Sequence, residues 1–92
     1  MIFHSQEWRD LGIAAKLVYI YLKAKYNGGN NGEIRLYYSE LKDVHGLRSP
    51  TTVSRAFKEL ETKGWVVRTQ FGGLHRHFNN YRLTGKYDDH II

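Results

Sequence analysis

The 92 residues suffice for one domain with one hydrophobic core, and 41% hydrophobic and 25% charged content is typical of a folded chain, not a disordered one. The absence of cysteine excludes disulfide bonds and thiolate zinc sites, and it fits a reducing, cytoplasmic location. No apolar run reaches membrane-spanning length and residues 1–4 do not begin a signal peptide, so we expect no membrane partner.

The positive charge is concentrated in the C-terminal half of the chain. The net charge is +5. Residues 48–86 hold eight basic and two acidic side chains, whereas the rest of the chain holds six basic and seven acidic ones. A one-sided basic field favours a polyanionic partner such as nucleic acid, and a basic surface without a partner would have the same composition.

A helical pattern runs from Ser5, a candidate cap, to about Tyr26, and Gly12 predicts a break between a short first turn and a longer helix. Residues 17–22 are apolar on nearly all sides. A helix of this kind is either the central helix of a domain or meets a second subunit, so a homodimer through it stays open.

Alternating side chains over 33–38 predict a short strand. Ser39 then predicts the cap of a second helix, from Glu40 to about His45, which Gly46 would end.

The third helix is predicted over Pro50–Lys63, because Ser49 is a good N-cap, proline suits the first helical position and Gly64 follows the last turn. Its apolar stripe consists of Val53, Ala56, Phe57 and Leu60. Residues 65–71 and 81–84 then predict two strands joined by the polar, basic loop 72–80, and residues 85–92 form a tail.

The order of helix, strand, helix, turn, helix and hairpin resembles the winged helix-turn-helix superfamily. Residues 52–65, Thr-Val-Ser-Arg-Ala-Phe-Lys-Glu-Leu-Glu-Thr-Lys-Gly-Trp, resemble its recognition helix and the start of its first wing strand. The turn over 46–51 is about one residue longer than that of the family. The resemblance covers nearly the whole chain. Within the superfamily, the chain most resembles small bacterial, plasmid and phage modules, including regulators and DNA-binding domains of replication proteins.

The resemblance implies an α+β winged helix-turn-helix domain over residues 1–92, with three helices, a short strand and a C-terminal β-hairpin wing. It further implies binding of double-stranded DNA, in transcriptional regulation or in plasmid or phage replication.

A DNA-binding face also follows from helix geometry. At 100° per residue, Thr51, Arg55, Lys58 and Thr62 fall opposite the apolar stripe, and a helix fits the DNA major groove. Arg55 suits a guanine and Lys58 suits a phosphate, although any exposed helix face is polar. The candidate DNA-binding residues are Arg48, Ser49, Thr51, Thr52, Ser54, Arg55, Lys58, Thr62, Arg68, His75, Arg76 and His77.

Arg76 in the wing loop suits a minor groove or a phosphate, and a solvated loop is the alternative. His75 and His77 lack a third ligand nearby in sequence, so we expect neither a metal nor another cofactor. Their protonation would raise DNA affinity as the pH falls.

Two further hypotheses compete with DNA binding. We interpret the aromatic residues Trp8, Tyr19, Tyr21, Tyr26, Tyr37, Tyr38 and Trp65 as core, and stacking on single-stranded bases is the alternative. A protein-interaction module would use the apolar first helix, where Tyr19→Glu would abolish complex formation. No serine, histidine and acid pattern suggests an enzyme.

Overall fold

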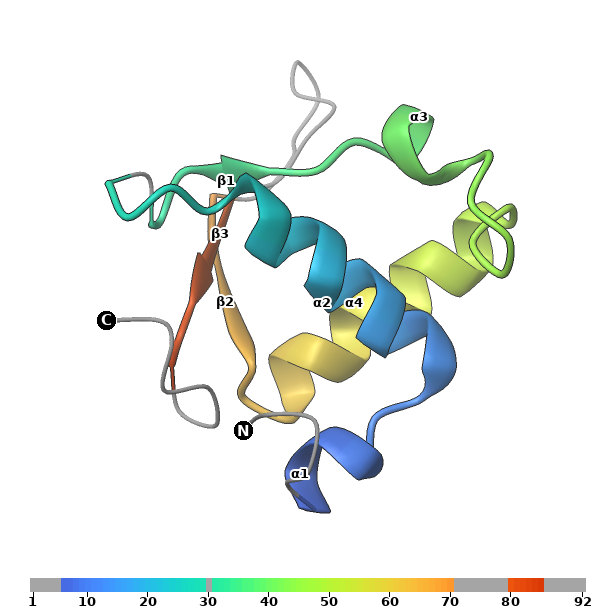
Figure 1. Ribbon diagram of the computed structural model, residues 1–92, viewed down its shortest axis with the longest axis horizontal. Coiled ribbons are helices and arrows are strands. Elements are labelled where there is room, and N and C mark those ends of the chain that lie inside the picture. The colour runs from blue at the N-terminus through green and yellow to red at the C-terminus, as the bar shows by residue number, and fades with distance from the viewer. Residues whose placement is uncertain (1–5, 30, 71–79, 86–92) are drawn as a thin grey trace.

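A computed structural model describes residues 6–29, 31–70 and 80–85. Four helices and three strands lie in these ranges (Figure 1). The α+β class expected from the sequence is confirmed, and no helix in the described ranges has the length and apolar character to cross a membrane. In chain order the elements are α1 (Gln6–Arg9), α2 (Ile13–Lys25), β1 (Ile34–Arg35), α3 (Tyr38–Leu41), α4 (Pro50–Thr62), β2 (Val66–Gln70) and β3 (Asn80–Leu83).

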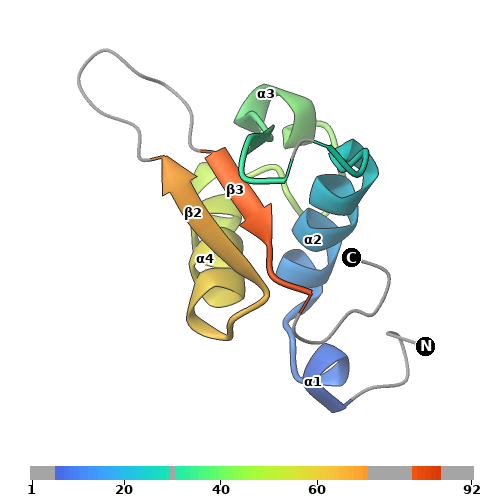
Figure 2. The same ribbon diagram turned by 90° about the vertical axis from the view of Figure 1, so that its left-hand side faces the viewer.

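The core lies between the crossed helices α2 and α4 and the three-stranded sheet (Figure 2). The sheet is antiparallel with the order β1-β3-β2, and β2 contacts α4 while β1 contacts α2. Val66 pairs with Leu83 in the β2–β3 register, and both side chains are buried. Before β1, the side-chain amide of Asn31 donates to the Leu83 carbonyl at 3.0 Å and accepts from the Leu83 N–H at 2.8 Å.

The break predicted at Gly12 is confirmed, because Gly12 lies between α1 and α2. A Cβ added at this position would approach Oε1 of Glu59 to 3.2 Å, so the carboxylate would have to move by a few tenths of an ångström to admit a larger residue. Gly12 therefore allows the Glu59 side chain of α4 to approach the α1–α2 junction closely.

Helix α4 begins where predicted and ends at Thr62, one residue before the predicted end. Pro50 takes the first helical position, and Ser49 is the N-cap residue, although its side chain makes no capping hydrogen bond. At the other end Gly64 has a φ of +82°, the Trp65 N–H donates to the Leu60 carbonyl at 2.9 Å, and the Gly64 N–H donates to that of Glu61 at 3.2 Å. These two bonds make a Schellman motif, which ends the helix and turns the chain into β2.

The second helix begins and ends earlier than predicted. Helix α3 spans Tyr38–Leu41 instead of Glu40–His45, so Ser39 lies inside the helix and the strand predicted over 33–38 shrinks to β1. The cause at the N-terminus is the Glu40 carboxylate, which accepts the Tyr37 N–H at 2.8 Å.

Beyond α3 the chain makes turns closed by i to i+3 hydrogen bonds. The Val44 N–H donates to the Leu41 carbonyl and the Leu47 N–H donates to the Val44 carbonyl, both at 2.9 Å. Because the spacing is three residues, the side chains of Leu41, Val44 and Leu47 lie on the same side of the chain, and Leu41 and Leu47 are fully buried. Packing of these residues explains why the α-helix does not continue to His45.

The interpretation of the aromatic residues as core is right for some and wrong for others. Trp8, Tyr19 and Trp65 are buried and meet edge to face, with ring centroids 5.1–5.9 Å apart. Three tyrosines are instead 37–39% exposed: Tyr21, Tyr37 and Tyr38. Tyr19 is 1% exposed, so Tyr19→Glu would disrupt the core and cannot test an interface.

Glu40 makes folding stability depend on pH. Its ion pair with Lys25, and next the hydrogen bond from the Tyr37 N–H, hold the pKa of its carboxyl below the ordinary value of 4.5. A lowered pKa means that the stabilisation is present above the pKa of the unfolded chain and is lost as the pH falls through that of the folded chain. We expect Glu40→Gln to lower the free energy of unfolding at neutral pH, and the difference from wild type to shrink below pH 4.5.

Urea titrations at neutral and acidic pH measure this difference. Glu33→Gln, at an exposed position with no ion pair inside the described ranges, is the control and should match wild type throughout. A Glu40→Gln deficit that persists undiminished in acid would contradict the expectation.

Candidate nucleic-acid interface

The outer face of α4, defined here as Thr51, Arg55, Lys58 and Thr62, is exposed to solvent. On the opposite side Val53, Ala56 and Leu60 are buried against the core, whereas Phe57 is only half-buried. The amphipathic pattern of the sequence therefore positions the two basic side chains in solvent, as expected from helix geometry.

The first acidic side chain of α4, Glu59, points to the α1–α2 junction. Its carboxylate accepts the Gly12 N–H at 2.7 Å and pairs with Lys63 at 3.3 Å. The Lys63 ammonium also donates to the Asp10 carbonyl at 2.7 Å. Both charges at this flank of α4 are used to hold the helix to the junction before α2.

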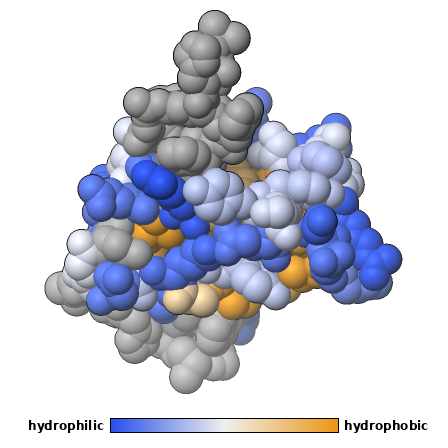
Figure 3. Space-filling model, turned by 90° about the horizontal axis from the view of Figure 1, so that it is seen from above, coloured by the Kyte–Doolittle hydropathy of each residue, from blue (hydrophilic) through white to orange (hydrophobic). Residues whose placement is uncertain are grey.

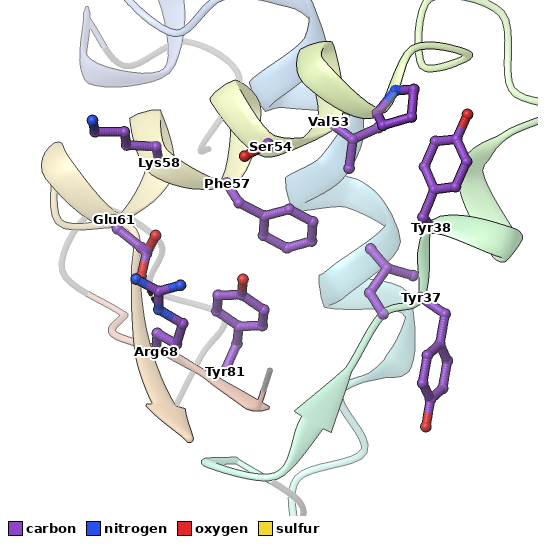
Figure 4. A pocket seen from close by; sticks show the side chains of 11 residues that line it. Tyr37, Tyr38, Val53, Ser54, Phe57, Lys58, Glu61, Arg68 and Tyr81 are labelled. Atoms are coloured by element: carbon purple, nitrogen blue, oxygen red, sulfur yellow. Dashed lines mark ion pairs between the residues drawn. The ribbon is translucent and has the colours of Figure 1, made fainter. Parts of the chain in front are cut away.

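The second acidic side chain, Glu61, lies at the other flank, where Oε1 is 3.1 Å from Nε of Arg68 on β2 (Figure 4). Arg68 is half-buried and its guanidinium joins β2 to α4. Arg68 therefore has a structural partner, which sequence reasoning did not foresee when it placed this residue among the DNA contacts.

The outer face consequently keeps a positive charge. Neither acid of α4 faces it, and inside the described ranges no carboxylate pairs with Arg48, Arg55 or Lys58. Figure 3, which views the molecule from above and not onto the outer face of α4, shows a mainly hydrophilic surface with small apolar areas between polar side chains in the described part.

A cleft of about 490 Å³ runs beside α4, between this helix, the sheet and the start of α3. In Figure 4 the rings of Phe57 and Tyr81 stand together in its middle, Tyr37 and Tyr38 stand at one side, and the charged side chains stand at the other. Phe57 and Tyr81 stack with centroids 4.7 Å apart and planes 15° apart. The Tyr38 hydroxyl donates to the Arg48 carbonyl, which holds its ring in place.

The structure brings most of the predicted residues to one helix and the loop before it. Thr52 and Arg68 are half-buried, and His75, Arg76 and His77 lie outside the described residues. In the described ranges no three His, Asp or Glu side chains gather as a metal site would require. The exposed predicted residues are Arg48, Ser49, Thr51, Ser54, Arg55, Lys58 and Thr62.

Sequence reasoning favoured a strand and the core for Tyr37 and Tyr38 and kept base stacking only as an alternative for all the aromatic residues together. The structure instead places these two tyrosines at the cleft, partly exposed. The only local signal was the pair of adjacent tyrosines itself, which form the N-cap and the first residue of α3.

Comparison with models of protein families, with curated proteins and with solved structures found no match in any of the three.

Proposed function

We propose that this chain binds double-stranded DNA through the outer face of α4, as a winged helix-turn-helix module. The observation that carries the proposal is the placement of the α4 charges: Arg55 and Lys58 face solvent while Glu59 and Glu61 are held at the flanks. An exposed helix with basic and hydroxyl side chains suits the major groove and its phosphates.

The order of elements and the antiparallel pairing of β2 with β3 support the winged-helix part of the proposal. One feature departs from it. The eight residues 42–49 connect α3 to α4, a longer connection than the three- or four-residue turn of a helix-turn-helix. The proposed contact therefore relies on α4 and the preceding Arg48, with transcriptional regulation or plasmid or phage replication as the process served.

Fluorescence anisotropy with a labelled random duplex, titrated with salt, tests duplex binding. Contacts from Arg48, Arg55 and Lys58 to three phosphates predict that the logarithm of affinity falls with the logarithm of salt with a slope of about −2.7 or steeper. Absence of binding at low salt would remove the proposal.

A protein partner for α2 is a second candidate function, which the exposed apolar side chains of that helix favour. Ile13 is 78% exposed and Ile20 46%, and Ala24 is exposed on the same side of the helix. Because α2 packs against α4 through its buried side, this surface points away from the outer face of α4. Helix α2 holds three lysines and no acid, and although Lys25 pairs with Glu40 of α3, the net positive charge of α2 favours an acidic partner over a second copy.

Sedimentation velocity of the chain, alone and in a cell extract, checks this second candidate. Ile13→Glu combined with Ile20→Glu is expected to abolish any self-association or complex without loss of stability, since both side chains are exposed. Val67→Glu, at a 40% exposed position on β2, is the matched control. Equal behaviour of the two variants would argue against a role for α2.

A further inference from the structure

The cleft beside α4 has the size and shape of a binding site for part of a flat, partly apolar ligand. Its volume of about 490 Å³ lies in the range of ligand pockets, roughly 300–1,000 Å³. Four aromatic rings line it: Tyr37, Tyr38, Phe57 and Tyr81. Such a lining favours a ligand that stacks.

Two of these rings, those of Tyr37 and Tyr38, stand partly exposed at one side of the cleft (Figure 4). Tyr37 is 39% exposed and its main-chain N–H is bonded to Glu40, while Tyr38 is 37% exposed and its hydroxyl is bonded to the Arg48 carbonyl. The Tyr38 ring is held by its own hydroxyl, so it loses little freedom when a ligand stacks on it.

The charge of the cleft selects an anionic ligand. Lys58 stands at its outer edge with no carboxylate partner in the described ranges, and the negative charge of Glu61 is compensated by Arg68. Ser54, also in the lining, adds an exposed hydroxyl. Rings that stack and a cation at the rim are the combination that binds single-stranded nucleic acid.

We propose that this cleft binds a single-stranded segment of nucleic acid, with unpaired bases stacked on Tyr37 and Tyr38 and a phosphate at Lys58. A duplex cannot use the cleft in this way, because its bases are paired and stacked on each other. This proposal goes beyond duplex binding and does not rest on it, since the two tyrosines lie outside the outer face of α4.

Anisotropy of a fluorescein-labelled oligothymidylate, with the full chain at low salt, is the test. Tyr37→Ala and Tyr38→Ala are each expected to lower affinity about 5- to 150-fold, the range of one base–aromatic stack. Tyr38→Phe keeps the ring and should retain most of the affinity. Tyr21→Ala is the matched control, because Tyr21 has the same 37% exposure on α2 and lies outside the cleft lining.

Duplex affinity, measured in parallel, separates this proposal from the proposed function. It should be unchanged in the Tyr37 and Tyr38 variants, whose fold is checked by far-UV circular dichroism. Failure of the chain to bind oligothymidylate, or equal losses in the Tyr21, Tyr37 and Tyr38 variants, would overturn the inference. So would binding of a glutamate–tyrosine copolymer in place of oligothymidylate, since the occupant would then be an acidic peptide.

Discussion

Trp65→Ala is expected to lower the free energy of unfolding by about 3–5 kcal/mol, the usual cost of truncating a buried tryptophan. The Trp65 side chain is 2% exposed and its ring meets those of Trp8 at 5.8 Å and Tyr19 at 5.1 Å. It therefore joins α1, α2 and the start of β2 at one point. The free energy of unfolding of a small domain is about 5–15 kcal/mol, so this loss would leave the variant close to unfolding.

Urea denaturation followed by far-UV circular dichroism measures the loss, because a tryptophan signal would change with the substitution itself. Val67→Ala, two residues along the chain and 40% exposed, should change the free energy of unfolding by less than about 1 kcal/mol. Similar losses in the two variants would mean that the three rings do not form the centre of the core.

The second large effect concerns duplex DNA and the two cations of the outer face. On a random duplex, where we propose that both side chains contact phosphates, removing Arg55 and Lys58 together by alanine substitution is expected to flatten the salt slope by about 1.8. On a specific site Arg55→Ala alone is expected to weaken binding about 5- to 150-fold, if this arginine reads a guanine. Salt titration of the anisotropy signal gives both values.

The matched control removes the same amount of charge from another part of the molecule. Arg9→Ala combined with Lys16→Ala, on α1 and α2, lowers the net charge equally and should leave the slope near that of wild type. Flattening to the same degree in both double variants would show that net charge, and not the outer face of α4, governs binding.

Local signals predicted α4 because each acts within a few residues. Pro50 occupies the first helical position, and Gly64 has the positive φ that ends the helix. The same kind of signal misplaced α3, because contacts beyond its own turn decide its bounds. Leu41, Val44 and Leu47 lie three residues apart, and the burial of Leu41 and Leu47 favours turns over a longer helix. No capping residue in the sequence indicates this.

In the candidate site, too, the features set by local sequence could be predicted, and those set by long-range contacts could not. Helical spacing alone puts Arg55 and Lys58 opposite the core, and the structure agrees. The partners of Glu59 and Glu61 are different, because Gly12 and Arg68 are brought to them only by folding. The cleft could not be predicted either, since its walls come from four separate parts of the chain: residues 36–38, residues 50–61, Arg68 and Tyr81.

The short β1 strand and the Asn31 amide have a consequence for behaviour at high concentration. An edge strand with a long row of unpaired main-chain groups invites another chain to add a strand, which is a route to aggregation. Here the β1 edge offers only Ile34–Arg35, and a side chain occupies the place beside Leu83 where more main chain would stand. An incoming strand would find few main-chain groups with which to form a ladder, so we expect this edge to be a poor template for fibre growth.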